Sequence, residues 1–327
     1  MRKQRDAYFD NAKLFLMILV VFGHFFQPFM DKDPVYNDLY YFIFLFHMPA
    51  FILISGFFSK GKPKTFKKLV VKLLIPYLFF QLIYSGYYTM IGLQDKFSFD
   101  LVTPQWALWF LLSLFFWNCL LKIVHRFPAK YVIGASILIA LVVGYFPIFG
   151  RYLAAQRTLT FFPYFIIGCY LPKEWIEKIK QFPRKSVAVL LFAGLFIFVA
   201  CNDLINKYWV FGSKPYEAYL DLPVFGAPLR MLFLTAGLIG IAAFFLVVPT
   251  KRYFFSKWGK NTLNVYLLHG FLVQGLRALD IDQVNMTVIE VVALFLFSII
   301  FTVALSSEWC QNWMQRIKSF VFYPVLS

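Results

Sequence analysis

The sequence predicts an all-α, polytopic membrane protein with about ten transmembrane helices. Hydrophobic residues make up 61% of the 327 residues, and the mean hydropathy is +0.68. A soluble domain is only about half apolar. Apolar runs of about twenty residues, the length that crosses a bilayer as a helix, recur from one end of the chain to the other. We therefore expect residues 1–327 to form a single integral membrane domain.

Ten apolar stretches are the predicted spans. They lie near residues 8–30, 39–59, 69–92, 106–124, 131–149, 159–172, 187–205, 228–249, 262–280 and 288–306. The sixth stretch is short, so we expect neighbouring helices rather than lipid to surround it. The first stretch is too long and too polar inside for a signal peptide, and no small-residue cleavage site follows it, so we expect it to be retained.

The basic residues predict the orientation of the chain. Of the 32 Lys and Arg residues, 23 lie at the N-terminus, in alternate loops on the same predicted side, and after residue 306. By the positive-inside rule, both termini then lie in the cytoplasm, which requires an even number of spans. The net charge of +16 is thus explained by membrane topology. Membrane lipids are the expected surroundings, and no nucleic-acid partner is expected.

Two ionisable residues, Lys13 and His24, lie inside the first predicted span. At ~100° per residue, eleven steps bring the helix back to nearly the same face, and the two residues lie roughly 16 Å apart along the axis. A lysine in hydrocarbon costs about 3 kcal/mol, so we expect this helix to line a polar site. Lys13 is equally well explained by a side chain that reaches the membrane surface or pairs with Asp10. His24 lies deeper, and a functional role explains it better.

The spacing of Lys13 and His24 resembles the Arg/Lys–ten residues–His motif that opens the acyltransferase 3 family of integral membrane O-acyltransferases. Further stretches resemble later blocks of this family in the same order: FHMPAFILISGFF (46–58), FKKLVVKLLIPY (66–77), QWALWFLLSL (105–114), FFPYFIIGCYL (161–171) and GKNTLNVYLLHGFL (259–272). The blocks are most similar to the branch typified by fucose 4-O-acetylases. The resemblance implies transfer of an acyl group, expected to be acetyl from acetyl-CoA, to a hydroxyl of a cell-surface or lipid-linked sugar in a bacterial plasma membrane.

Acyl transfer from a thioester to a hydroxyl requires a base for the hydroxyl proton and donors for the developing oxyanion. His24 suits the base, because neutral imidazole is available near neutral pH. It lies ~24 Å from the start of the helix, past the midplane of a ~30 Å apolar core. Lys13 lies near the cytoplasmic end. We therefore expect Lys13 to face the donor and His24 to face the sugar or glycan acceptor.

Lys67, Lys68 and Lys72 lie where a cytoplasmic loop meets the third span and are candidates for binding the phosphates of acyl-CoA. Lys68 and Lys72 are four residues apart and would share a helix face. The family usually has two arginines three residues apart at this position. Anchoring at the cytoplasmic membrane surface explains these lysines equally well.

The remaining candidates would line the acceptor side. Tyr266 and His269 are three residues apart and share a face of the ninth span, where they could line the same cavity as His24. Asn261 is the expected N-cap of that helix. Arg157 is a candidate clamp for the acceptor or for a carboxylate, and Trp109 is a candidate cavity-lining residue.

The four cysteines are far apart and form neither a CxxC motif nor a His/Cys cluster, so we expect no disulfide framework and no metal. One alternative function remains open, a transporter or exporter of glycans or small solutes in which His24 and Lys13 relay protons. Transporters typically have two related halves with broken helices at matching places. No such pairing is visible in the sequence.

Overall fold

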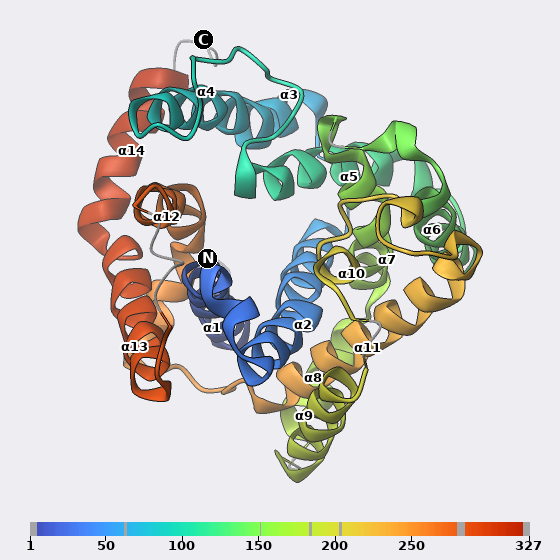
Figure 1. The fold of residues 1–327 in the computed structure, drawn as a ribbon. Helices are drawn as coiled ribbons and strands as arrows, with labels where there is room; N and C mark the ends of the chain where they lie inside the picture. The colour runs from blue at the N-terminus through green and yellow to red at the C-terminus, as the bar shows by residue number, and fades with distance from the viewer. Residues whose placement is uncertain are drawn as a thin grey trace. The chain divides into compact units, whose positions relative to one another are not determined.

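The computed structural model describes residues 5–61, 64–150, 152–182, 185–202, 205–279 and 285–322. Within these ranges the chain is helical and contains no strand, which confirms the predicted all-α class (Figure 1). The α-helices are α1 (Ala7–Phe26), α2 (Pro34–Ser59), α3 (Phe66–Leu69), α4 (Ile75–Met90), α5 (Trp109–Val124), α6 (Ala129–Val142), α7 (Ala155–Tyr170), α8 (Lys173–Gln181), α9 (Lys185–Ala200), α10 (Lys207–Phe211), α11 (Gly226–Val247), α12 (Thr262–Arg277), α13 (Val288–Leu305) and α14 (Glu308–Phe322).

The predicted count of ten spans is not confirmed. In the described residues, six helical segments are long and apolar enough to cross a membrane, or seven if the bent pair α8 and α9 forms one span. Every predicted stretch overlaps a helix, but α6, α7, α9 and α12 have only 14 to 16 residues. A helix of this length rises about 24 Å at most, less than a ~30 Å apolar core. The protein is nonetheless a multi-pass membrane protein.

The chain forms two compact units, each assembled from segments that are distant in sequence. The first unit contains residues 1–48, 176–203 and 239–327, and the second contains residues 49–175 and 204–238. Three of the four boundaries fall within α2, α8 and α11, so each of these helices contributes residues to both units. A single functional domain over residues 1–327 stays a prediction.

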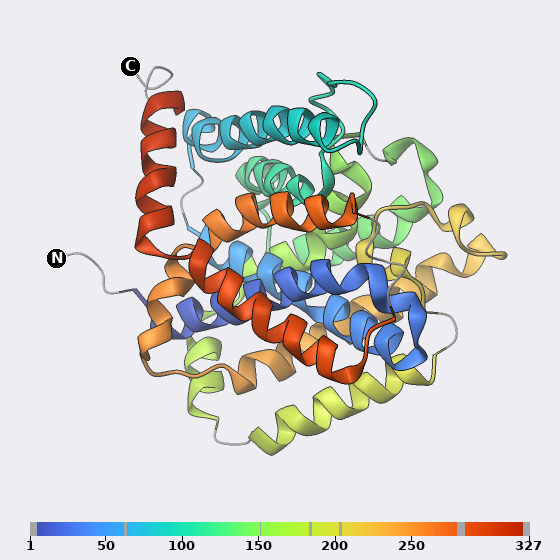
Figure 2. The ribbon, with the colours of Figure 1, turned by 60° about the vertical axis from the view of Figure 1, so that its left-hand side comes forward.

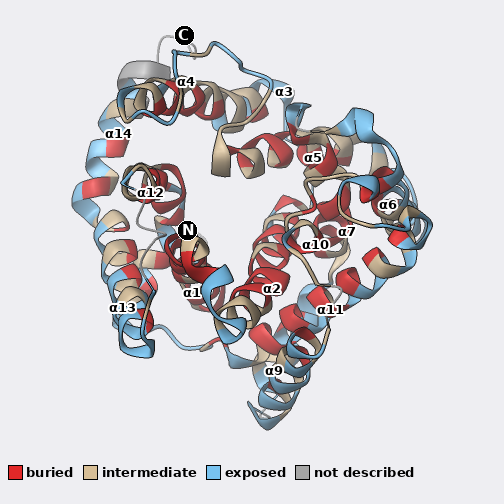
Figure 3. Cartoon of the chain, in the orientation of Figure 1, coloured by how far each residue is buried: buried red, intermediate tan, exposed pale blue. Residues whose placement is uncertain are grey.

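Helix α1 is the core of the first unit. It is buried over most of its length and packs against α12, α13 and the 3-10 segment Phe254–Lys260 (Figure 3). In contrast, α13 exposes an apolar stripe that includes Ile289, Leu296 and Ile300, as expected for a helix that faces lipid. After α13 the chain turns sharply into α14, which lies against α12 and α13 (Figure 2).

The start of α1 is fixed to residues 249–260 by a buried asparagine and a glycine. The Asn11 amide donates to the carbonyl oxygens of Pro249 (2.8 Å) and Lys251 (3.0 Å), and its oxygen accepts a hydrogen bond from Ser256 (2.6 Å). A Cβ atom at Gly259 would overlap the backbone carbonyl of Asp10. The two backbones can therefore approach this closely only because residue 259 has no side chain.

In the second unit, α2 and α7 cross at two glycines. A Cβ at Gly56 would overlap the carbonyl oxygen of Phe165, and a Cβ at Gly168 would overlap the carbonyl oxygen of Leu53. Small residues at such crossings let membrane helices pack backbone against backbone. This close packing fixes α7, which carries Arg157 at its first turns.

Candidate active site

Three of the four histidines gather in the first unit, each on a different helix. His24 lies near the end of α1, His47 in α2 and His269 in the middle of α12. The rings of His24 and His269 are stacked, with centroids 5.5 Å apart and planes inclined by 25°. The Phe44 ring makes edge contacts with both His24 (6.0 Å) and His47 (4.5 Å). The structure thus brings together His24 and His269, and it adds His47.

Phe44 is held against α1 by the small residue before His24. A Cβ at Gly23 would lie 2.5 Å from the Phe44 ring, so any larger residue would displace that ring. On its other side Phe44 stacks on Tyr40, with ring centroids 4.0 Å apart. Helix α2 can therefore place an aromatic ring directly beside the imidazole of His24.

Hydrogen bonds fix the tautomers of the two fully buried histidines. Nδ1 of His47 lies 2.8 Å from the carbonyl oxygen of Ile43, and Nδ1 of His269 lies 2.8 Å from that of Val265. A carbonyl oxygen only accepts, so Nδ1 carries the proton in each ring and Nε2 is the acceptor of a neutral imidazole. His24 is only half-buried. It is therefore the histidine of the three that a substrate can reach most directly.

Arg277 connects the two helices that carry the stacked rings. From the last turn of α12 its guanidinium donates to the backbone oxygen of His24 (2.9 Å) and to the side chain of Gln27 (2.7 Å). Tyr266 lies one turn from His269, with ring centroids 6.5 Å apart. Asn261 occupies the N-cap position of α12 as predicted, but its side chain donates to the carbonyl of Ser306 (2.9 Å) instead of capping the helix.

Lys13 lies toward the other end of α1, in an ion pair. Its Nζ is 2.9 Å from Oδ1 of Asp10, and Arg5 approaches the same oxygen at 3.3 Å. The side chain of Asp10 is 3% exposed and that of Lys13 is 18% exposed, so water screens this pair only in part. The pairing with Asp10 is the alternative that the sequence left open for Lys13.

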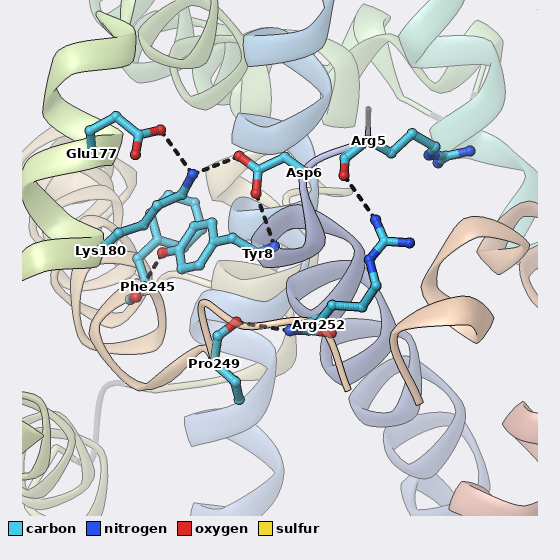
Figure 4. A network of polar contacts seen from close by, with 9 residues as sticks. Arg5, Asp6, Tyr8, Glu177, Lys180, Phe245, Pro249 and Arg252 are labelled. Atoms are coloured by element: carbon cyan, nitrogen blue, oxygen red, sulfur yellow. Dashed lines mark hydrogen bonds and ion pairs between the residues drawn. The ribbon is translucent and has the colours of Figure 1, made fainter. Parts of the chain in front are cut away.

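A second network holds the same end of α1 (Figure 4). Lys180 bonds both Asp6 (2.6 Å) and Glu177 (2.9 Å), and the Tyr8 hydroxyl donates to the carbonyl of Phe245 (2.7 Å). Charges and polar groups therefore concentrate at the start of this helix, whereas the imidazoles lie near its end. The two ends of α1 differ in chemistry, as the sequence predicts for Lys13 and His24.

The other predicted site residues belong to the second unit. Cζ of Arg157 lies 5.0 Å from the ring centroid of Trp109 and 5.8 Å from that of Phe211. Trp109 also stacks on Phe161, with centroids 5.6 Å apart. The structure thus brings Arg157 and Trp109 together, and Phe211 from α10 joins them. No sequence pattern predicts that Phe211 lies beside these two residues, because it is more than fifty residues from either of them in the chain.

The predicted donor-binding lysines Lys67, Lys68 and Lys72 are exposed. A π-helical turn, Val70–Leu74, interrupts the helix, so the regular four-residue spacing assumed for Lys68 and Lys72 does not hold there. Two further lysines lie close by in sequence. Nζ of Lys64 is 3.4 Å from the Asn118 oxygen, and Lys60 donates to the carbonyl of Leu171 (2.9 Å).

The fold and these residues define a class of protein, a helical membrane protein with two stacked imidazoles on neighbouring helices. The family model described as "Acyltransferase domain", that of the acyltransferase 3 family, matches residues 6–307. The chain belongs to this family, as its sequence blocks predicted. This membership favours acyl transfer over the transporter alternative. In the described residues, no group of three or more His, Cys, Asp or Glu side chains is placed to hold a metal ion.

The chain is also similar to two nodulation proteins. It is 32% identical over 211 residues to the nodulation protein NolL of Sinorhizobium fredii, a match that covers 58% of this chain and 54% of that protein. It is 27% identical over 315 residues to the nodulation protein NolL of Mesorhizobium japonicum, covering 85% of this chain and 79% of that protein. The first match thus spans about half of the relative's length. No solved structure matches the chain.

Proposed function

We propose that the protein is an O-acyltransferase that moves an acyl group, acetyl in the simplest case, from acyl-CoA to a hydroxyl of a cell-surface or lipid-linked sugar. The main support is the stacked pair of His24 and His269 inside a chain of the acyltransferase family. The pair combines a half-buried imidazole with a fully buried one whose Nδ1 donates to a backbone carbonyl. A reachable base in a protected interior is what deprotonation of a hydroxyl requires.

In the proposed reaction His24 takes the proton of the sugar hydroxyl as its oxygen attacks the thioester carbonyl. The carbon–sulfur bond then breaks, the CoA thiolate leaves, and the proton passes from His24 to that sulfur. Nδ1–H of His269 donates to the Val265 carbonyl, so Nε2 is the acceptor nitrogen when this ring is neutral. We take His269 to be neutral in this step, so that it adds no positive charge that opposes protonation of His24.

A labelled donor tests this function. The full chain, purified in nanodiscs, is incubated with acetyl-CoA labelled in the acetyl group and a panel of glycans. We expect a base-labile acetyl ester on at least one glycan and release of CoA in equal amount. If the protein in liposomes instead moves a glycan across the membrane while the labelled acetyl group stays on CoA, the protein is a transporter.

At the donor end, we propose that Lys13 of the first unit attracts the phosphates of acyl-CoA. We propose the same role separately for Lys67, Lys68 and Lys72 of the second unit. Lys13→Met should raise the KM for acyl-CoA by about tenfold, because one charge-assisted contact is lost, and should leave kcat nearly unchanged. Lys130→Met is a matched control, since Lys130 is an exposed lysine on α6. If Lys13→Met lowers only the amount of inserted protein, Lys13 is a structural anchor paired with Asp10.

We also propose that both termini face the cytoplasm of a bacterial plasma membrane. Reporter fusions after Asp33, Gln94 and Tyr216 should then read external, and fusions after Lys62, Phe127 and Lys257 should read cytoplasmic. Lys62 lies outside the described residues. Each of the other positions lies between helices or in a short 3-10 segment, so truncation there leaves the preceding helix intact. One reversed reporter would contradict the even number of spans and the depth assigned to His24.

A further inference from the structure

In the second unit, side chains from three other helices, α5, α10 and α11, converge on residues 157–161 of α7. Trp109 of α5 contacts both Arg157 and Phe161. Phe211, at the end of α10, contacts Arg157. The next residue, Gly212, has a φ of +57° and packs so closely on Thr160 that a Cβ would lie 2.8 Å from its methyl group. Arg157 is thus held between two aromatic rings and stays half-buried.

The backbone just before Trp109 and just before Arg157 adopts unfavourable conformations. The non-glycine residues with positive φ in the described chain are Trp106 (36°), Leu153 (52°) and Ala154 (51°). They lie just before Trp109 and Arg157, and the Leu153 amide donates to the carbonyl of Val102 (2.7 Å). Residues with a Cβ atom rarely adopt a positive φ. Where such φ values do occur, they are found preferentially at sites that bind ligands or substrates.

A second arginine reaches the same turn from α11. Arg230 is 2% exposed and donates to the Thr160 hydroxyl (3.0 Å), the Ala140 carbonyl (3.3 Å) and the Tyr219 hydroxyl (3.1 Å). Its Cζ also lies 4.5 Å from the ring centroid of Tyr216. All these groups are neutral, whereas a guanidinium keeps its charge when buried. A buried positive charge held by neutral groups therefore lies beside the turn that carries Arg157.

The short segment after α9 adds further positive charge. Lys207 and Lys214 lie 5.8 Å and 5.7 Å from the ring centroid of Tyr208. The acidic residues in the described part of this segment, Glu217 and Asp221, are exposed, and the Asp100 carboxylate accepts from the amides of Val102 and Thr103. The surroundings of Arg157 therefore favour an anion.

We propose that Arg157, Trp109 and Phe211 form a subsite for the acceptor and select a sugar that carries an oxyanion, either a carboxylate or a phosphate. The planar guanidinium binds two oxygens of such a group at once. The aromatic rings pack against the apolar face of the sugar ring. The inference rests on the proposed function only in that it takes the bound sugar to be the acceptor.

Binding measured without acyl-CoA tests this inference. The full chain is placed in nanodiscs of zwitterionic lipid, and saturation-transfer NMR titrations compare a neutral disaccharide, a disaccharide that contains a uronic acid and a disaccharide phosphate of similar size. At least one acidic probe should bind about tenfold more tightly than the neutral probe, and this preference should weaken as salt is raised. Comparison of the two acidic probes shows which oxyanion the subsite takes.

Substitutions separate charge from packing. Arg157→Gln should remove the preference for the acidic probe and leave the neutral probe unaffected, whereas Arg157→Lys should keep part of it. Trp109→Leu should weaken all three probes. Arg126→Gln, which removes an exposed arginine of the same unit, is the matched control and should change nothing. Equal affinity for all probes in the unsubstituted chain, or an unchanged preference in Arg157→Gln, would overturn the inference.

The two proposals can fail separately. If the acidic probe binds through Arg157 but no glycan is ever acylated, the proposed function is wrong and the anion-selective subsite stands. If a neutral glycan is acylated as well as an acidic one, and neither depends on Arg157, acyl transfer stands and the subsite does not exist.

Discussion

His24→Gln is expected to lower acyl transfer by about 10²–10⁴-fold, the usual cost of removing a positioned base. Glutamine preserves hydrogen bonding at this position but cannot take a proton. The contacts that hold this end of α1 should persist, because Arg277 binds the backbone oxygen of His24 rather than its ring. Protein yield and thermal stability in detergent should therefore stay near normal. Activity with labelled acetyl-CoA and a glycan, measured beside both quantities, checks the result.

His125→Gln is the matched control for this substitution. Nδ1 of His125 bonds the carbonyl four residues earlier, like His47 and His269, but His125 lies at the exposed end of α5. It should keep full activity. If His24→Gln keeps most of its activity, His24 is not the base, and His269→Gln becomes the decisive variant.

Gly259→Ala is expected to destabilise the first unit by about 1–3 kcal/mol or more, because the added methyl group overlaps a backbone carbonyl that cannot turn aside. The carbonyl belongs to Asp10, and moving it would strain the three hydrogen bonds of its neighbour Asn11. Thermal unfolding in detergent should show a clearly lowered midpoint.

Gly194→Ala provides the comparison. Gly194 lies in α9 of the same unit, and a Cβ atom added there would meet open space, with no neighbouring atom within 4 Å. Alanine is favoured over glycine inside a helix by about 0.5–1 kcal/mol, so this variant should be as stable as the parent or slightly more so. If both variants unfold at the same temperature, the close approach at Gly259 does not contribute to stability.

The sequence predicts the helices well because each helix depends on a local run of apolar residues. The all-α class and the approximate position of a helix in every predicted stretch follow from such runs, and the blocks shared with the family predicted its membership. The number of spans does not follow from the apolar runs alone. Helices α6, α9 and α12 are shorter than the predicted apolar stretches that they overlap, and α7 is similarly short. The division into two units was not predicted, since it depends on contacts between distant segments.

The candidate site shows the same limit. A shared helix face predicted that His269 could line a cavity with His24, and the two rings are indeed stacked. The sequence did not place His47 beside them, because that contact runs through Phe44 and requires a small residue at Gly23. For Arg277 the sequence indicates only a basic residue near the end of the ninth predicted span, yet its guanidinium donates to the backbone oxygen of His24. Its role depends on where α12 ends in space rather than on any spacing in the chain.

Mass spectrometry of a single turnover distinguishes His24 as a base in direct transfer from His24 as a nucleophile. The purified chain in nanodiscs is mixed with labelled acetyl-CoA, with and without an acceptor glycan, and is quenched and analysed for free CoA, acetylated sugar and acetylated protein. If His24 is the base, CoA and acetylated sugar appear in equal amounts when the acceptor is present. Without acceptor, we expect neither free CoA above background nor acetylated protein. A burst of CoA without acceptor, together with an acetyl group on the peptide that contains His24, would show that His24 is a nucleophile and would contradict its role as a base.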